Sequence, residues 1–357
     1  MLPTAHTAGA SLRNIRYYVQ SQKNSFLGLF TCSSHMNHPK FSLGFFPTPL
    51  HELKRLSEAF PDYTLYIKRD DETGLASGGN KTRKLEYLIQ RALSEGCDTV
   101  ITSGAQQSNH CRQTAAACSV AGLGCHLLLG GEEPEVYDGN LLLSSLLGAK
   151  IHFTGTRRKG ENADHLKQQL EKAGSKPFVI PYGGSNLTGA LGFVSAVNEL
   201  KAQLQQRKLD YIFFASSSGG MQAGLTLGKA LHELDATLVP ISIDKDETQG
   251  RALEDVVFGI VQEGVRALGI TKTIARSDIT LNRDYDHDGY GVLTQNETEA
   301  IRTLAQTEGI LLDPVYTGRA FYGMLDILEK KKIPPANVLF WHTGGLPAVF
   351  TYADELR

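Results

Sequence analysis

The sequence has few cysteines, only five in 357 residues, and no C-x-x-C pair. This odd, sparse set excludes a disulfide framework and a structural zinc site, and it is typical of reduced thiols in an intracellular protein. Cys111, Cys118 and Cys125 follow one another at intervals of seven residues. We interpret them as small buried residues on one helix face and an adjoining strand, without a reactive role.

Long hydrophobic runs and an excess of either charge are also missing. No apolar run approaches the roughly 18–20 residues that a membrane helix needs, so we expect no membrane span. The 36 Lys+Arg and 38 Asp+Glu residues give a formal net charge of −2. This near-neutral charge argues against nucleic acid or a membrane surface as the main partner. The length allows two or three domains, or one large α/β unit split into lobes.

The N-terminal segment lacks acidic residues altogether. Its first 51 residues contain no Asp or Glu, and they include Arg13, Arg16 and Lys23 among many Ser, Thr and Asn residues. This composition is typical of a transit peptide, although an upstream mis-assigned start before Met36 is the alternative. We expect residues 1–42 to be an extension that the fold does not need, and the protein to be cytoplasmic, with organelle targeting left open.

From about residue 64, short β-rich runs alternate with amphipathic helical stretches. The alternation predicts an α/β fold with a mostly parallel sheet that helices cover on both faces. Ligands of such sheets bind beyond the carboxyl ends of the strands, so the strand-to-helix turns are the expected site. The predicted strands are Thr64–Lys68, Asp98–Thr102, Gly124–Leu129, Lys150–Phe153, Pro177–Ile180, Tyr211–Ala215, Thr237–Ile243 and Asn337–Trp341, and the main predicted helices are Asn80–Gly96, Gln106–Ala121, Thr188–Gln205, Thr248–Leu268, Thr294–Glu308 and Gly318–Lys331.

A first unusual turn, SGGNKTRK over residues 77–84, places Lys81 at the start of a strong helix. Its two glycines let the backbone approach a ligand closely. The positive field of a helix N-terminus favours the neutral form of the amine, which is the form that makes a Schiff base with a carbonyl. The alternative is a glycine-rich turn that leads into a helix with an exposed basic first turn.

A second turn, TSGAQQSNH over residues 102–110, follows a buried-type strand and leads into a helix. Hydroxyls, amides and free backbone N–H groups converge there, which suits a carboxylate or another anion. An ordinary capped helix start is the alternative. We interpret His110 as a packed or solvent-facing histidine without a catalytic role.

A third turn, ASSSGGMQAG over residues 215–224, combines hydroxyls with a glycine pair at a helix N-terminus and predicts a phosphate cradle. It lacks both the Gly-Lys-Ser/Thr of a Walker A loop and the G-x-G-x-x-G of a nicotinamide dinucleotide site, so a phosphate monoester fits better.

Residues 284–289 match the opening of a calcium-binding EF-hand loop, but the twelfth position of that loop is Gln295 and should be Glu. We interpret that run as a solvated loop and predict no metal site.

A lysine in a glycine-rich turn, an anion-binding turn and a monophosphate cradle together specify a phosphate-bearing aldehyde held on a lysine, which is pyridoxal 5′-phosphate. The segments GGNKTRKLEYL, QQSNHCRQTAAA, SGGMQAG, TEGILLDPVYTG and HTGG, in this order, resemble the D-cysteine desulfhydrase and 1-aminocyclopropane-1-carboxylate deaminase family. The resemblance covers about residue 43 to the C-terminus. It implies fold type II of the pyridoxal-phosphate enzymes, with a large cofactor-binding lobe over 43–84 and 196–357 and a small lobe over 85–195. It also implies a small amino-acid substrate and a homodimer.

The resemblance also implies roles for individual residues. Lys81 is similar to the lysine that bears the cofactor. The other positions that match the family are Asn80 and Asn109 at the cofactor ring, Ser217, Ser218, Gly219, Gly220 and Met221 in the phosphate loop, Gln107, Ser108 and Asn109 at the substrate carboxylate, and Tyr290 and Tyr316 as the two active-site tyrosines.

Two positions separate the branches of the family. The deaminases have Glu after the DPVY tyrosine and Leu before the final Gly-Gly, whereas this sequence has Thr317 and Thr343. A carboxylate keeps the pyridine nitrogen protonated and suits the opening of a cyclopropane ring. A threonine hydroxyl leaves the nitrogen largely neutral, which suffices when thiolate is the leaving group. The sequence does not show which of the two threonines contacts the nitrogen.

The resemblance therefore implies α,β-elimination of D-cysteine to pyruvate, ammonia and hydrogen sulfide. Ser108 would hold the substrate carboxylate, and Lys81, Tyr290 or Tyr316 would take the α-proton. A 1-aminocyclopropane-1-carboxylate deaminase and a sulfonate-eliminating lyase are alternatives with the same cofactor. A non-catalytic small-molecule-binding protein on the same scaffold is the alternative from another class, and the presence of Lys81, Ser108 and Tyr316 argues against it.

Overall fold

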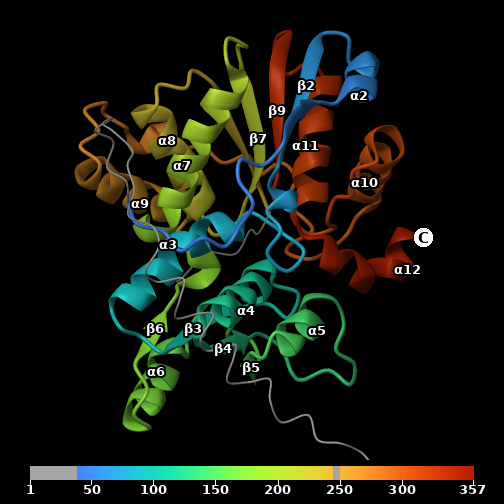
Figure 1. The fold of residues 1–357 in the computed structure, drawn as a ribbon. Coiled ribbons are helices and arrows are strands. Elements are labelled where there is room, and N and C mark those ends of the chain that lie inside the picture. Colours follow the sequence, from blue (N-terminus) through green and yellow to red (C-terminus); the bar gives the residue numbers. More distant parts are fainter. Residues whose placement is uncertain (1–37, 244–249) are drawn as a thin grey trace, which may run out of the picture. The chain divides into compact units, whose positions relative to one another are not determined.

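Two β-sheets organise residues 38–243 and 250–357, the part of the chain that the computed structural model describes (Figure 1). The expectations for residues 1–37, Cys32 included, and for a helix start at Thr248 lie outside the described residues. The first sheet has the order β1-β2-β9-β7-β8, and only β1 runs antiparallel to its neighbour. Its strands are β1 (Leu50–Glu52), β2 (Tyr63–Arg69), β7 (Tyr211–Ser216), β8 (Thr237–Ser242) and β9 (Ala336–His342).

The second sheet is entirely parallel and has the order β5-β4-β3-β6. Its strands, β3 (Thr99–Gly104), β4 (Gly124–Leu129), β5 (Lys150–Phe153) and β6 (Pro177–Val179), all fall within the range expected for a small lobe. The helices are α2 (Lys54–Ala59), α3 (Lys81–Ser94), α4 (Asn109–Ala121), α5 (Gly139–Leu146), α6 (Ala163–Lys172), α7 (Leu187–Leu204), α8 (Gly220–Leu231), α9 (Leu253–Ala267), α10 (Gln295–Glu308), α11 (Thr317–Glu329) and α12 (Ala353–Leu356), with short 3₁₀ turns at η2 (Asp70–Glu72), η3 (Tyr182–Gly184), η4 (Arg276–Asp278) and η5 (Leu346–Tyr352).

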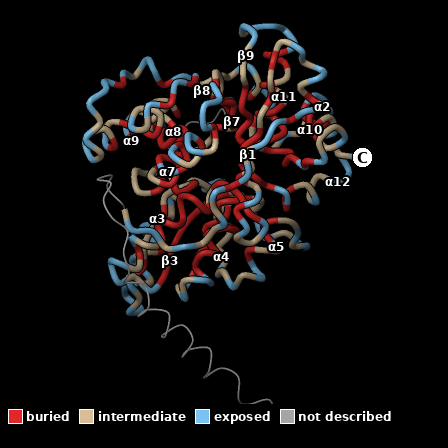
Figure 2. Tube along the Cα trace, turned by 45° about the horizontal axis from the view of Figure 1, so that its top comes forward, coloured by how far each residue is buried: buried red, intermediate tan, exposed pale blue. Residues whose placement is uncertain are grey.

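Strand residues alternate between two cores in the first sheet. Phe213 and Phe340 pack against α10 and α11, whereas Phe214 and Trp341 pack against α7 and α8 on the opposite face. This alternation follows from the period of two in a strand, and it buries both faces of the sheet as a parallel sheet requires. Figure 2 shows the buried positions concentrated along the strands and the inner faces of these helices.

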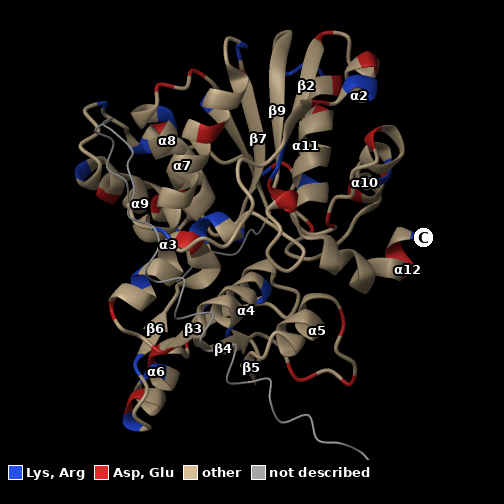
Figure 3. Cartoon of the chain, viewed as in Figure 1, with Lys and Arg blue, Asp and Glu red and all other residues tan. Residues whose placement is uncertain are grey.

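Helices also cover both faces of the second sheet. On one face Val100 and Leu127 pack against α3, α4 and α5, and on the other Ile101 and Leu128 pack against Ala163 and Leu166 of α6. Cys111, Cys118 and Cys125 are buried and free in the first of these cores, as the sequence predicts. Charged side chains are sparse in both sheets, where Lys, Arg, Asp and Glu occur only on β1, β2 and β5 (Figure 3).

The predicted α/β architecture is confirmed, and the bounds of β4 and β5 agree residue for residue with the sequence-based prediction. The helix predicted over 106–121 begins three residues later because Ser108 caps it, accepting a hydrogen bond from the Cys111 N–H. No specific prediction covers β1, α5 or α6, which lie in shorter or more polar segments. Within the described ranges no helix is long and apolar enough to cross a membrane.

Candidate active site

The carboxyl ends of β3, β7 and β9 converge on a partly enclosed cavity. Both sheets contribute to its wall. The lining residues are Asn80, Lys81, Lys84, Ser108, Asn109, His110, Tyr182, Gly183, Ala215, Ser216, Ser217, Ser218, Gly219, Met221, Gln222, Tyr316 and Thr343. Of the residues expected in the site, Gln107, Gly220, Tyr290 and Thr317 are not in direct contact with the cavity.

Lys81 lies at the start of α3, as the sequence predicts, and it lines the cavity. Burial lowers the pKa of the Lys81 ammonium to about 8. The sequence predicts a neutral amine from the field of the helix, whereas burial is the cause that the structure supports, and it acts in the same direction. A lysine with this pKa is about one-tenth neutral at pH 7, far more than an unperturbed lysine, and that fraction can attack an aldehyde.

The lysine turn, residues 76–80, has an unusual backbone. Ala76, Ser77, Gly78 and Gly79 have φ values of 43°, 72°, 67° and 127°, so two non-glycine residues adopt the left-handed region. Glycine is needed at residue 79 because side-chain-bearing residues rarely adopt its φ of +127°, and a Cβ there would also lie 2.4 Å from Nε2 of Gln113. Left-handed alanine and serine cost about 1–3 kcal/mol each and persist only where surrounding contacts hold them.

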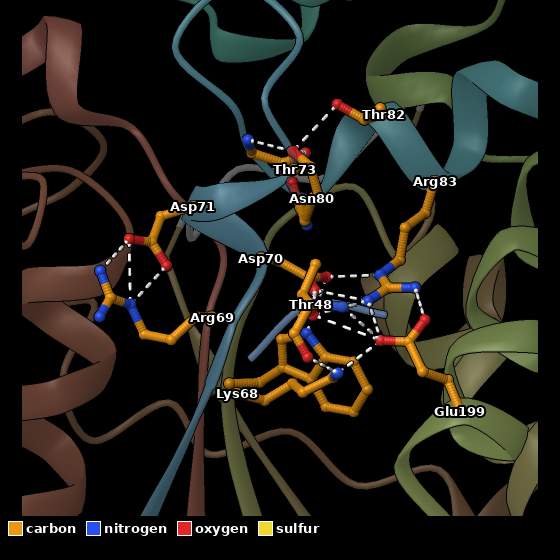
Figure 4. A network of polar contacts seen from close by, with 12 residues as sticks. Thr48, Lys68, Arg69, Asp70, Asp71, Thr73, Asn80, Thr82, Arg83 and Glu199 are labelled. Carbon is orange, nitrogen blue, oxygen red and sulfur yellow. Dashed lines mark hydrogen bonds and ion pairs between the residues drawn. The ribbon is translucent and has the colours of Figure 1, made fainter. Parts of the chain in front are cut away.

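One set of holding contacts comes from the buried carboxylate of Asp70 (Figure 4). It accepts hydrogen bonds from Arg83 at 2.7 and 2.8 Å, from the Thr48 hydroxyl at 2.9 Å and from the Trp341 indole at 2.8 Å. The Asp70 carbonyl also accepts the Gly79 N–H at 3.0 Å. Asp70 thus joins the end of β2, the strand β9 and the first turn of α3.

Arg83 extends this network to α7 (Figure 4). Its guanidinium donates to both carboxylate oxygens of Glu199 at 2.9 Å, and Lys68 also binds Glu199. Burial alone would raise the pKa of Glu199, but Arg83 and Lys68 lower it to about 2. Two cations, Lys68 and Arg83, therefore balance two carboxylates, Asp70 and Glu199, at the start of α3. Sequence reasoning missed this network, because its members are far apart in the chain.

The serine loop, residues 216–220, precedes α8. Gly219 has φ +83° and caps the helix, and Ser217, Ser218, Gly219 and Met221 line the cavity as expected for a phosphate loop. The Gly220 N–H is already used, because it donates to the Ser185 hydroxyl at 3.1 Å. The loop therefore offers hydroxyls and the N-terminus of α8 to an anion.

Lys84 is a site residue that sequence reasoning missed. It is fully buried, and its amine donates to the Gly183 carbonyl at 2.9 Å and to the Ser185 hydroxyl at 3.3 Å. No carboxylate of the described residues pairs with it, and burial together with Lys81 lowers its pKa well below the ordinary value. A Cβ on Gly220 would lie 2.8 Å from its Nζ, so the amine faces the serine loop. Its spacing three residues after Lys81, on one helix face, was the available signal.

Some polar residues of the turn before α4 line the cavity, and others bind neighbouring parts of the chain. Ser108 and Asn109 line the cavity. The Gln107 amide instead donates to Asp138 at 2.9 Å and accepts from the Asn140 N–H at 2.8 Å, so it supports the turn from outside.

His110 is packed, as expected. Its Nε2 lies 2.8 Å from the Thr102 hydroxyl, which donates to the Ile180 carbonyl at 2.9 Å. Nε2 therefore bears the proton in this pair, and burial lowers the His110 pKa well below its ordinary value. The imidazole is neutral near pH 7.

Tyr290 and Tyr316 form a hydroxyl pair at 2.6 Å, with rings in an edge arrangement. Tyr316 lines the cavity and Tyr290 supports it from behind. Burial, followed by the neighbouring Tyr290, raises the pKa of Tyr316 well above its ordinary value. Tyr316 therefore keeps its proton near neutral pH, so it can donate a hydrogen bond but cannot take up a proton.

The two threonines differ in where their hydroxyls point. Thr343 lines the cavity, whereas the Thr317 hydroxyl is fully buried and lies 2.7 Å from the Asp313 carboxylate. The same carboxylate accepts the Tyr316 N–H at 2.9 Å, so Thr317 and Asp313 shape the backbone that bears Tyr316. Asn80 joins this side of the wall, because its N–H donates to the Thr343 carbonyl at 3.0 Å.

The run over 284–289 is less solvated than the sequence suggests, since Asp286 is buried. Within the described part of the chain, no group of three or more His, Cys, Asp or Glu side chains is placed to bind a metal ion.

The residues around the cavity fit a phosphate-bearing aldehyde. An amine of lowered pKa lies on one side, and serine hydroxyls, a helix N-terminus and the Lys84 amine lie on another. An aldehyde needs the first group and a phosphate monoester the second. An amide (Asn109) and a hydroxyl (Thr343) remain for the polar atoms of an aromatic ring.

Comparisons with known proteins agree with this fit. A family model described as "Pyridoxal-phosphate dependent enzyme" matches residues 41–344. A D-cysteine desulfhydrase of Yersinia enterocolitica serotype O:8 is 42% identical over 326 residues, covering 89% of this chain and 97% of that protein. A D-cysteine desulfhydrase of Klebsiella pneumoniae strain 342 is 40% identical over 326 residues, with the same coverage. A solved structure described as an ACC deaminase homologue has a TM-score of 0.82 and 38% identity, covering 90% of this chain and 96% of that one.

Proposed function

The chain belongs to the pyridoxal-phosphate-dependent enzymes, and from that membership we propose that it catalyses the α,β-elimination of D-cysteine to pyruvate, ammonia and hydrogen sulfide. One observation supports this reaction over ring opening: among the described residues, the cavity wall contains no Asp or Glu. Without a carboxylate beside it, a pyridine nitrogen is not held protonated. The weaker electron withdrawal that follows suits a good leaving group such as thiolate.

The residues that would hold the cofactor follow from the wall of the cavity. Lys81 would bind its aldehyde carbon, and Lys84 with Ser217, Ser218 and the N-terminus of α8 would bind its phosphate. Asn109 and Asn80 would face the ring oxygen, and Thr343, which lines the cavity, is the proposed partner of the ring nitrogen. When bound, the cofactor supplies an electron sink for the substrate's α-carbon.

The substrate carboxylate would bind at the start of α4. Ser108 accepts the Cys111 N–H at 3.2 Å through a lone pair, so its own hydroxyl hydrogen is free to be donated to a carboxylate oxygen. The N-terminal N–H groups of this 13-residue helix add further donors and a favourable dipole.

Two residues are placed to assist the elimination. Lys81 Nζ, with a pKa of about 8, would take the α-proton once the substrate amine has displaced it. Tyr316 keeps its proton and would donate a hydrogen bond from Oη to the sulfur, which departs as hydrosulfide. Tyr290, with its hydroxyl 2.6 Å away, would hold the Tyr316 hydroxyl in place.

The test is a set of parallel assays on the purified, cofactor-loaded protein. We expect sulfide and pyruvate from D-cysteine, much less from L-cysteine, and loss of both products in Lys81→Ala. Release of 2-oxobutyrate from 1-aminocyclopropane-1-carboxylate at a higher kcat/KM would contradict the proposal and establish the second candidate, which the 38% identity to the ACC deaminase homologue favours. Sulfite release from a sulfonate substrate would identify the sulfo-lyase variant instead.

Assembly, location and lobe boundaries complete the proposal. We propose a homodimer, supported by the exposed apolar side chains of Val136, Leu146 and Phe350 on and beside α5 and η5. The four free cysteines of the described residues support the cytoplasm as the location. The second sheet supports a small lobe over 85–195, inserted between 43–84 and 196–357.

A further inference from the structure

Arg112, in the first turn of α4, is a fully buried arginine with no acidic partner among the described residues. A buried guanidinium normally pairs with a carboxylate, because removing its charge from water without compensation costs several kcal/mol. Here it donates to three neutral oxygens: the Gly78 carbonyl at 2.6 Å, Asn140 Oδ1 at 2.8 Å and Asn109 Oδ1 at 3.4 Å. Its Nε has no partner. A buried guanidinium bound only to neutral oxygens is a poor way to stabilise the fold, so we looked for the effect of Arg112 on the residues that it contacts.

Arg112 fixes the orientation of two side-chain amides, those of Asn140 and Asn109. An arginine only donates hydrogen bonds, so the amide atoms that face it must be oxygens. With its oxygen on Arg112, Asn140 turns its NH₂ group to Asn109 Oδ1 at 2.9 Å and to the Gln107 carbonyl at 3.0 Å. Asn109 Oδ1 thereby accepts from two donors. The NH₂ group of Asn109 is left for the cavity, which Asn109 lines.

Arg112 and its neighbour Gln113 also hold the lysine turn. Arg112 binds the carbonyl of Gly78, three residues before Lys81. The next residue of α4, Gln113, accepts the Thr82 N–H at 2.9 Å and its hydroxyl at 3.0 Å. Two consecutive residues of α4 therefore hold the backbone on both sides of Lys81.

Resting on the proposed function, we propose that Arg112 is a positioning residue that fixes Asn109 as a hydrogen-bond donor to the cofactor's ring oxygen and holds the lysine turn against the helix that binds the substrate carboxylate. If Asn109 turned over, its NH₂ group would face the Nη1 of Arg112, and a donor would oppose a donor. The orientation of Asn109 is thus set by Arg112 and Asn140 together, before any ligand binds.

The main test uses Arg112→Met, which keeps the apolar length of the side chain and removes every donor. We expect the variant to bind pyridoxal phosphate, with a lower ratio of visible to near-ultraviolet absorption, because a donor on the ring oxygen favours its ionised, visibly absorbing form. We also expect kcat for D-cysteine to fall about ten- to a hundredfold, the effect of one hydrogen bond to a charged group. An absorption ratio equal to that of the parent protein would overturn the proposal.

A double-mutant cycle separates positioning from a general loss of structure. If Arg112 acts on the ring through Asn109, adding Arg112→Met to Asn109→Ala should change the absorption ratio by less than about twofold beyond Asn109→Ala alone. If each substitution lowered the absorption ratio by its own factor and the two factors multiplied in the double variant, the proposal would be contradicted. Thr114→Val is the matched control, because Thr114 is buried on the same helix and donates only to the His110 carbonyl. It should leave the absorption ratio unchanged.

Asn109→Asp keeps the test decisive if Arg112→Met does not fold. This change gives Arg112 a carboxylate partner, so thermal stability should be retained, while oxygen replaces the donor toward the cavity and the absorption ratio falls. A normal ratio in a stable Asn109→Asp protein would sink the proposal. These spectra require only that the cofactor is bound. They therefore test the role of Arg112 even if the parent protein acts on a substrate other than D-cysteine. A parent protein that binds no cofactor would instead contradict the proposed function.

Discussion

Lys81 and Lys84 lie one helical turn apart on α3, yet their amines have different surroundings. Lys81 lines the cavity with a pKa of about 8, and the Lys84 amine donates to the Gly183 carbonyl and the Ser185 hydroxyl. Neither has a carboxylate partner among the described residues. Both amines therefore lose protons more readily than ordinary lysines, which suits Lys81 to covalent chemistry. An anion bound beside Lys84 would favour its protonated form, which keeps one N–H free after the hydrogen bonds to Gly183 and Ser185.

The pKa of Lys81 predicts how fast the cofactor-free protein reacts with pyridoxal phosphate. Only the neutral amine attacks the aldehyde, so the rate should rise as the pH approaches 8 and level off above it. An unperturbed lysine would instead gain about tenfold per pH unit up to its pKa of about 10.4. Stopped-flow absorbance measures this rate. Continued tenfold increases above pH 9 would contradict the assignment, and Lys81→Arg should form no linkage at any pH.

At the scale of elements, α3 is held at its start by two separate groups of residues. Asp70 and Arg83 join it to the first sheet and α7, while Arg112 and Gln113 join it to α4. The periodicity of its apolar residues was enough to predict the helix. It could not reveal either group of contacts, because each depends on residues brought together by the folded chain.

Asp70→Asn should destabilise the protein strongly. The change removes the charge that pairs with buried Arg83, and breaking a buried pair costs about 3–5 kcal/mol, although Glu199 retains part of the compensation. Urea denaturation of the two proteins gives the difference in free energy of unfolding.

Asp62→Asn is the matched control for that change. Asp62 pairs with Lys331 at 2.8 Å on the surface, where the two side chains are 40% and 74% exposed. An exposed pair contributes about 0–1 kcal/mol, so this variant should unfold close to the parent protein. Equal losses for Asp70→Asn and Asp62→Asn would show that the buried network is not what anchors α3.

At the scale of the molecule, the cavity draws its wall from both sheets. Ser108 and Asn109 follow β3 of the second sheet, while the serine loop and Thr343 follow β7 and β9 of the first. The architecture and the positions of these turns could be predicted, because glycines, hydroxyls and caps mark them locally. The exclusion of Gln107 and Thr317 from the cavity could not, because it depends on Asp138, Asn140 and Asp313, whose contacts a linear pattern does not contain.

A ligand that contacts both sheets should stabilise them together. At a cofactor concentration of a hundred times its Kd, binding adds about 2.7 kcal/mol to the free energy of unfolding. Calorimetry of the cofactor-free and cofactor-bound proteins should therefore show one transition that moves to higher temperature as a whole. Two transitions, only one of which responds to the cofactor, would show that a single sheet binds it.

The pair of lysines in a wall without carboxylates has a practical consequence for anyone who handles the cofactor-free protein. Among the described residues, the serine loop, Lys84 and the α8 N-terminus make a receptor for any small oxyanion, and nothing in its geometry requires the rest of a cofactor. Phosphate and sulfate buffers should therefore occupy it, slow reconstitution in proportion to their concentration, and protect the empty protein against heat. Preparations exchanged into such salts and into chloride will differ in apparent activity although the protein is the same.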